Sequence, residues 1–141
     1  MVNQKFEAKH YFAAAKHRDI NEFLAETCEK HGIRSGTISA IGMVRDLTLG
    51  FWNTDAKKYE EYQANEISEL VSLTGDISLL DGKPFFHIHL VISDKNGKTT
   101  GGHLIKGTIY YSEISIVAYE KPLLSRKLDD ETGLKIISGL S

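Results

Sequence analysis

The sequence has little cysteine and proline, no excess of basic residues and no long apolar run. Its one cysteine, Cys28, excludes an internal disulfide bond. Its two prolines, Pro84 and Pro122, fall outside the strands that the residue pattern predicts, so they interrupt none of them. No apolar run approaches the roughly 18–20 residues of a membrane-spanning helix, and the first residues lack the apolar stretch of a signal peptide. We therefore expect a cytoplasmic protein that has no membrane segment.

The charge balance bears on nucleic-acid binding. The chain carries 17 Lys and Arg against 19 Asp and Glu, a formal net charge of −2. Proteins that bind DNA through their own surface usually have a basic excess, because neutralising phosphates supplies much of the affinity. DNA as a direct partner is therefore disfavoured, although a local basic patch would still permit it. The length of 141 residues, 41% of them hydrophobic, fits one domain over residues 1–141.

The pattern of residues predicts one helix followed mainly by strands. Asp19 to His31 has helical spacing, with Asp19 as N-cap, Glu22 completing a capping box and Gly32 suited to the residue after the helix. The expected strands are residues 5–15, 37–43, 47–51, 57–62, 69–73, 75–80, 85–93, 100–105 and 108–118. Residues 123–141 are apolar enough to be ordered, but their pattern favours no element type. The prediction is an α+β protein, a mainly antiparallel β-sheet with a flanking α-helix, in a single domain.

The segment FFHIHLVIS at residues 85–93 carries the clearest chemical signal. Side chains alternate between the two faces of a strand, so His87 and His89 share one face while the other face is wholly apolar. A three-residue turn over residues 95–97 would place His103 directly opposite His89. A slip of one residue would turn His103 to the other face, which makes the register testable. Gly101 and Gly102 fit a bulge or a close backbone approach.

Three neutral imidazoles that leave one open position are typical of catalytic zinc sites. The predicted ligands of a divalent metal are therefore His87, His89 and His103. Zinc is the metal expected, although imidazole also suits copper, nickel and iron. The alternative is that His87 and His89 are ordinary surface histidines. This alternative is disfavoured because the hairpin register brings a third histidine to the same place. Affinity for the metal should fall as the pH drops through roughly 6.5, the ordinary pKa of histidine. The other histidines, His10, His17 and His31, are interpreted as structural or incidental.

Several motifs resemble the PPC domain family, the plants and prokaryotes conserved domains. They are, in order, Ala40-Ile41-Gly42-Met43, Glu69-Leu70-Val71-Ser72-Leu73-Thr74-Gly75, His87-Ile88-His89, Gly101-Gly102-His103-Leu104 and the stretch from Arg126 to Gly133. The resemblance implies a β-rich fold with a flanking helix, a homotrimer, and a metal site at the three histidines. Plant members bind DNA through separate AT-hooks, and this chain has no Arg-Gly-Arg-Pro core of that kind. The fold implied is also similar to that of acetolactate decarboxylase, which likewise holds zinc through histidines.

Three functions stay open at the level of sequence. The first is a metal-binding, homotrimeric PPC protein with a DNA-associated or regulatory role. The second is a metal-dependent enzyme that acts on a small molecule, for which Glu69 and Glu113 are available carboxylates. The third is an assembly module in which the metal only stabilises a hairpin. A basic face would favour the first and a concave apolar pocket at the metal would favour the second.

Overall fold

The protein is described here by a computed structural model that covers residues 5–121 and 123–140, and these contain eight strands and one α-helix. Strands account for 71% of the residues and helix for 9%. The predicted α+β class is therefore wrong, and the fold is β-rich with a single minor helix. The reason lies in strand length: residues 36–53 form one bent strand and residues 99–121 another, where the sequence pattern indicated two shorter strands each. None of the helices in the described residues is long and apolar enough to cross a membrane.

The elements follow one another along the chain as β1 (Glu7–Asp19), α1 (Ile20–His31), β2 (Gly36–Asn53), β3 (Lys58–Ala64), β4 (Ser68–Leu80), β5 (Lys83–Ser93), β6 (Thr99–Lys121), β7 (Leu124–Leu128) and β8 (Lys135–Leu140). All pairings are antiparallel except the short contact between β4 and β7. The predicted helix and its caps are confirmed: the Asp19 side chain accepts from the backbone N–H of Glu22 at 2.9 Å, and Gly32 is left-handed with φ 65°.

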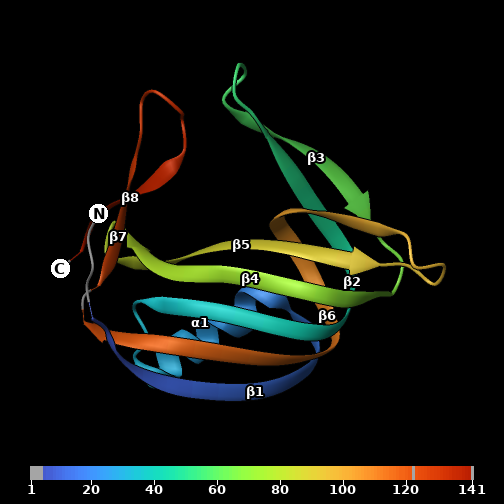
Figure 1. Ribbon diagram of the computed structural model, residues 1–141, viewed down its shortest axis with the longest axis horizontal. Helices are drawn as coiled ribbons and strands as arrows, with labels where there is room; N and C mark the ends of the chain where they lie inside the picture. The colour runs from blue at the N-terminus through green and yellow to red at the C-terminus, as the bar shows by residue number, and fades with distance from the viewer. Residues whose placement is uncertain (1–4, 122, 141) are drawn as a thin grey trace.

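The sheet closes on itself through its two longest strands. β2 pairs with both β4 and β6, and β5 pairs with both β4 and β6, so these four strands form a closed circuit of pairings. Both long strands change partner near Asp46 and Gly107, where the register between them shifts. Past the bend, β2 pairs with β3, and the β2–β3 hairpin rises away from the rest of the sheet (Figure 1).

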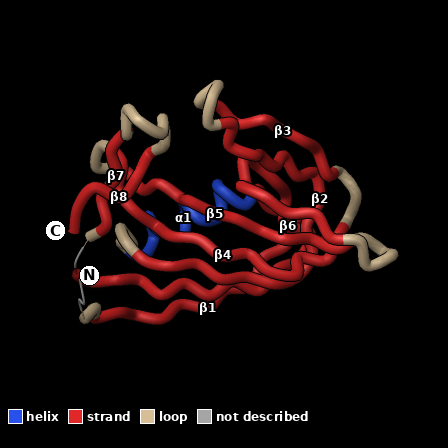
Figure 2. Tube along the Cα trace, turned by 45° about the horizontal axis from the view of Figure 1, so that its top comes forward, coloured by secondary structure: helices blue, strands red, loops and turns tan. Residues whose placement is uncertain are grey.

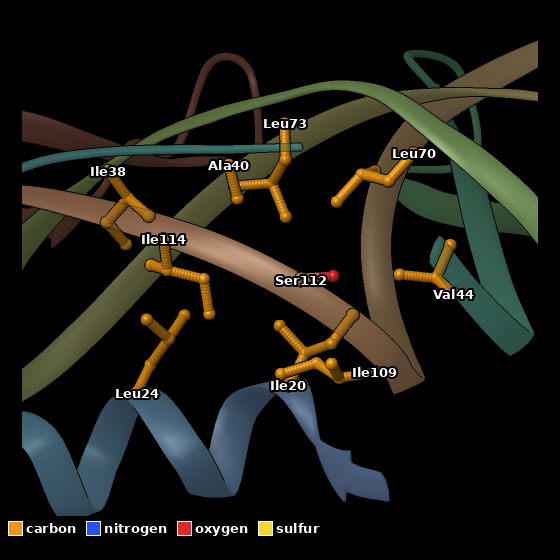
Figure 3. Close-up of a pocket in the computed structure, with 10 residues that line it drawn as sticks. All are labelled: Ile20, Leu24, Ile38, Ala40, Val44, Leu70, Leu73, Ile109, Ser112 and Ile114. Carbon is orange, nitrogen blue, oxygen red and sulfur yellow. The ribbon is translucent and has the colours of Figure 1, made fainter. Parts of the chain in front are cut away.

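The core lies between α1 and the curved sheet. Ile20, Leu24 and Cys28 are the buried residues of the helix. Figure 3 shows Ile20 and Leu24 pointing towards Ile109 and Ile114 of β6, with side chains of β2 and β4 above them. The cavity among these residues is only about 10 Å³ and almost wholly apolar, so the interior is close-packed and has no room for a ligand.

The C-terminal segment forms a second raised hairpin. β7 lies beside the end of β4, with Arg126 paired to Leu80, and β8 returns antiparallel to β7. The β7–β8 loop and the β2–β3 hairpin stand on the same side of β5 (Figures 1 and 2). The two are joined by hydrogen bonds from the Trp52 indole to the Thr132 carbonyl, 3.2 Å, and from Lys57 Nζ to the Asp130 carbonyl, 2.5 Å. Together they frame the space above β5.

Candidate metal centre

Strand β5 presents two histidines on the face opposite the core. Ile88, Leu90 and Ile92 are 1–4% exposed and belong to the core, while His87 is half-buried and His89 exposed on the other face. The predicted alternation of this strand is confirmed. Because the apolar face anchors the strand, the two imidazoles are held side by side without contributing to the core.

The β5–β6 hairpin brings His103 to the pair. The backbone of Asp94 donates to the Lys98 carbonyl at 3.0 Å, and His89 pairs with His103 in the antiparallel ladder. The Asp94 carboxylate fixes the turn by accepting from the backbone N–H groups of Asn96 and Lys98. The predicted register is thus confirmed. The glycine pair before His103 serves close approach rather than a bulge, since a Cβ on Gly102 would collide with the hydroxyl of Tyr62.

The three imidazoles form a compact cluster. One ring nitrogen from each of His87, His89 and His103 lies within 4.8 Å of the others, and the ring centroids are 4.9–5.5 Å apart. The Nε2 atoms of His87 and His89 are 3.1 Å apart. Ligands at about 2.0–2.1 Å from a tetrahedral zinc lie roughly 3.3–3.4 Å from one another. The spacing of this pair therefore suits a common ion with small adjustments of the side chains.

A buried arginine lies behind His87. The side chain of Arg126 in β7 is 7% exposed and donates from one terminal nitrogen to both oxygens of Asp76 at 2.9 and 2.8 Å. The Nδ1 atom of His87 is 3.8 Å from the Asp76 carboxylate and 3.4 Å from Arg126. Metal-binding histidines commonly turn their second nitrogen towards a carboxylate in this way. Burial, and then the charge of Arg126, lower the pKa of His87, which favours the neutral form that a metal requires.

His103 is held by an aromatic stack. The Tyr59 ring of β3 lies parallel to it, with centroids 4.3 Å apart, and Trp52 meets Tyr59 edge-on at 4.9 Å. The Nδ1 atom of His103 is buried without a hydrogen-bond partner among the described residues. Burial lowers the pKa of His103 to about 4, helped by the neighbouring histidines. A neutral ring with a buried, unpaired nitrogen is the state in which a metal ion is a favourable partner.

The histidines lie in a cleft of about 790 Å³, which is within the range of small-molecule sites. Its walls come from β2, β3, β5, β6 and the C-terminal hairpin. The residues besides the histidines are Asn21, Trp52, Tyr59, Glu61, Phe85, Phe86, Leu104, Ile105, Arg126, Gly133, Leu134, Lys135 and Ile136. The cleft is thus mostly apolar and aromatic, with a few charged groups.

The structure places the other residues singled out from the sequence away from this cleft. Glu69 pairs with Ser93 at the far end of β5, and Glu113 lies in the middle of β6, where the Tyr111 hydroxyl donates to it at 3.2 Å. The remaining histidines lie on β1 and α1: His17 packs on Tyr110 and His31 on Tyr11. Cys28 is buried in the helix, and burial raises its pKa to about 11.

Sequence reasoning missed several residues of the cleft. Tyr59 and Glu61 fall in a segment that was predicted only as a strand, yet both line the cleft because residues two apart share one face of β3. Asp76 and Arg126 are 50 residues apart, and no local pattern relates them. The one available signal was Arg126, which begins the C-terminal stretch that resembles the PPC family.

Comparison with known proteins identifies the family. The family model described as the Plants and Prokaryotes Conserved (PCC) domain, also abbreviated PPC, matches residues 1–121. The chain belongs to this family. A curated relative, the bifunctional protein GlmU of Synechococcus sp. (strain JA-3-3Ab), is 30% identical over 119 residues. The match takes in 82% of this chain but only 18% of that protein, so the chain spans less than a fifth of its length.

Several solved structures are similar to this chain over nearly its whole length. A metal-containing protein from Archaeoglobus fulgidus is 30% identical, with a TM-score of 0.91 over 99% of this chain and 100% of the other. A PPC protein from Pyrococcus horikoshii is 28% identical, with a TM-score of 0.92 over 100% and 99%. A candidate DNA-binding protein from Bacteroides thetaiotaomicron is also 28% identical, with a TM-score of 0.85 over 94% and 96%.

The expected likeness to acetolactate decarboxylase is found at the level of fold. The Bacillus subtilis enzyme has a TM-score of 0.59 over 92% of this chain and 60% of its own, at 12% identity. At this identity the likeness describes the arrangement of strands and carries no activity over to this chain.

Proposed function

We propose that this PCC domain binds one divalent metal ion through His87, His89 and His103, and that zinc is the preferred ion. The observation that carries the proposal is the convergence of three ring nitrogens within 4.8 Å from two strands whose register fixes them. The Archaeoglobus relative described as metal-containing supports it. An all-imidazole set suits zinc and other late transition metals, and is poor for magnesium or calcium, which prefer oxygen.

The residues around the cluster suit a site that is open on one side. Asp76 and Arg126 support His87 from behind, and Tyr59 fixes the plane of His103. Three protein ligands leave a fourth position of zinc for water or for a ligand, where the ion acts as a Lewis acid. A ligand of the bound ion would reach it from the cleft, because all three histidines line the cleft.

The substitution His89→Ala tests the site. It should remove most of the bound zinc and leave unfolding nearly unchanged, because His89 is exposed and the apolar face of β5 is untouched. His10→Ala is the matched control, since it removes an exposed histidine of β1. Elemental analysis of the purified proteins gives the metal content. Equal zinc in the wild type and His89→Ala would refute the three-histidine site.

A metal-dependent reaction on a small molecule is the second candidate function. The 790 Å³ cleft favours it, because an ion that only stabilised a hairpin would need no such space. Glu61 is the carboxylate among the residues that line the cleft, so it is the group available there for general acid or base chemistry. A DNA-associated role rests on relatives described as candidate DNA-binding proteins, and the net charge of −2 disfavours it.

We further propose that the chain is cytoplasmic and that it assembles as a homotrimer, which the family resemblance implies. Large apolar side chains exposed on the sheet, among them Phe12 at 70% and Ile41 at 56%, are surfaces that an assembly would cover. Light scattering during size exclusion measures the mass directly. A mass of three chains is expected, and a monomer at micromolar concentration would refute the trimer.

A further inference from the structure

We propose that the cleft binds a small planar carboxylate, with Lys135 as its counter-charge and the aromatic wall formed by Trp52, Tyr59 and Phe85 against its flat face. This inference deepens the proposed function and rests on the metal site described above. It concerns residues that the metal itself does not use: a cation from β8 and rings from β2, β3 and β5.

The charges of the cleft indicate an anionic ligand. Arg126 is neutralised by Asp76, and its other nitrogens donate to Ser78 at 2.7 Å and to the Lys135 carbonyl at 2.6 Å. Lys135 forms no ion pair within residues 5–121 and 123–140, and its ammonium lies 5.4 Å from the Phe85 ring centroid. Three neutral imidazoles leave both positive charges of a divalent ion uncompensated. Against these stands one lining carboxylate, Glu61, so the loaded cleft has a positive balance.

The shape of the wall indicates a flat ligand. Phe85 lies two residues before His87 on the same face of β5, and the Trp52–Tyr59 pair, from β2 and β3, also lines the cleft. An aromatic ring that carries the carboxylate can stack on the rings of this wall, while the carboxylate itself points towards the cations. The volume exceeds what an ion and its water need, and it suits a molecule of several heavy atoms.

The cleft is also built from segments that are held together. The Trp52 indole and Lys57 ammonium donate to carbonyls of the β7–β8 loop, which positions the aromatic wall relative to Lys135. A Cβ on Gly133 would lie 3.1 Å from Lys57 and 3.2 Å from Trp52, so a glycine at this point lets the two hairpins meet. A ligand therefore meets a surface that is largely formed in advance, which lowers the cost of binding.

The test uses the cobalt-loaded protein, with benzoate as probe and two readouts. Cobalt absorption reports ligands at the metal, and the fluorescence of Trp52, the chain's one tryptophan, reports the cleft. Benzoate at millimolar concentration should change both signals, whereas neutral benzamide and non-planar cyclohexanecarboxylate should bind more weakly. Lys135→Gln should weaken benzoate about fivefold, the size of one partly exposed charge interaction. Lys135→Arg should restore binding, and Lys98→Gln, a charge removed from the distant β5–β6 turn, should have no effect.

The outcomes separate this inference from the metal site. A protein that takes up no cobalt overturns both. A protein that is fully loaded with cobalt but shows no response to benzoate overturns the carboxylate inference alone. The carboxylate inference is also overturned if Lys135→Gln binds benzoate as tightly as Lys98→Gln does, or if the wild type binds benzamide as tightly as benzoate. The backbone carbonyl of Lys135, which accepts from Arg126, is retained in both substitutions of this residue, so the hairpin keeps its anchor.

Discussion

Arg126→Met should be among the most damaging single substitutions near the cleft. The Arg126 side chain is 7% exposed, and each of its three nitrogens has an acceptor: Ser78, the Lys135 carbonyl and the Asp76 carboxylate. Methionine keeps much of the length of the side chain but removes every donor. Asp76, which is 26% exposed, would then be partly buried without a counter-charge.

The expected cost follows from that uncompensated carboxylate. Removing one partner of a buried ion pair destabilises a protein by about 3–5 kcal/mol. The partial exposure of Asp76 places the expected value near the lower end, about 3 kcal/mol. For a chain of this length that corresponds to a fall in Tm of roughly 10 °C. Arg126 stabilises the protein through the geometry of its guanidinium hydrogen bonds as well as through its charge. Arg126→Lys should therefore retain only part of the stability that Arg126→Met loses.

Guanidinium unfolding followed by circular dichroism, at one fixed protein concentration and with a chelator present, measures the loss. A double-mutant cycle with Asp76→Asn isolates the pair, and the coupling between the two substitutions should be about 1–3 kcal/mol. Proton NMR of His87 adds a second readout, because loss of the Arg126 charge should raise the pKa of that imidazole. A loss below about 1 kcal/mol, or strict additivity in the cycle, would refute the reasoning.

Three further predictions concern pH and nucleic acid. The pKa of His87 is lowered and that of His103 lies at about 4, so protons compete with the metal at these two rings at lower pH than the ordinary histidine value of roughly 6.5 implies. Zinc affinity measured by competition should therefore fall more steeply towards pH 4 than around pH 6.5. In the metal-free protein, the unfolded chain takes up more protons than the folded chain between about pH 6.5 and pH 4. The free energy of unfolding should therefore decrease as the pH falls through this range. Constant stability across the range would contradict the lowered pKa values. Binding to duplex DNA should be weak at physiological salt because the net charge is −2, and tight, strongly salt-dependent binding in a fluorescence titration would contradict this.

The metal ligands were predictable because they depend on short-range rules. Alternation along β5 places His87 and His89 together, and one three-residue turn fixes His103 opposite His89. Each step involves fewer than twenty residues of chain, and a register error of one residue would have turned His103 to the opposite face of the sheet. The helix was predictable for the same reason, since its caps at Asp19 and Gly32 are local signals.

The class of fold and the rest of the cleft were not predictable in this way. Glycine and polar residues near positions 46 and 107 read as strand ends, whereas the long strands β2 and β6 bend there and continue with new partners. Whether a strand ends or bends depends on which strands are available to pair with it, and that is a property of the whole sheet. The contacts of Arg126 with Asp76, and of Tyr59 with His103, likewise join residues that are 40 or more positions apart in the sequence.

The histidines and the cations of the cleft lie in different parts of the chain, and this separation suggests how the cleft acquires its preference for a ligand. The family model matches residues 1–121, which contain all three histidines, Asp76 and the rings of Trp52, Tyr59 and Phe85. The two cations of the cleft, Arg126 and Lys135, lie beyond that match, on the C-terminal hairpin. A change at Lys135 alters charge without disturbing the ladder that holds the histidines, because β8 pairs only with β7 among the described strands. We therefore expect substitutions at Lys135 to change which anion binds, and substitutions of the histidines in β5 and β6 to change whether metal binds at all.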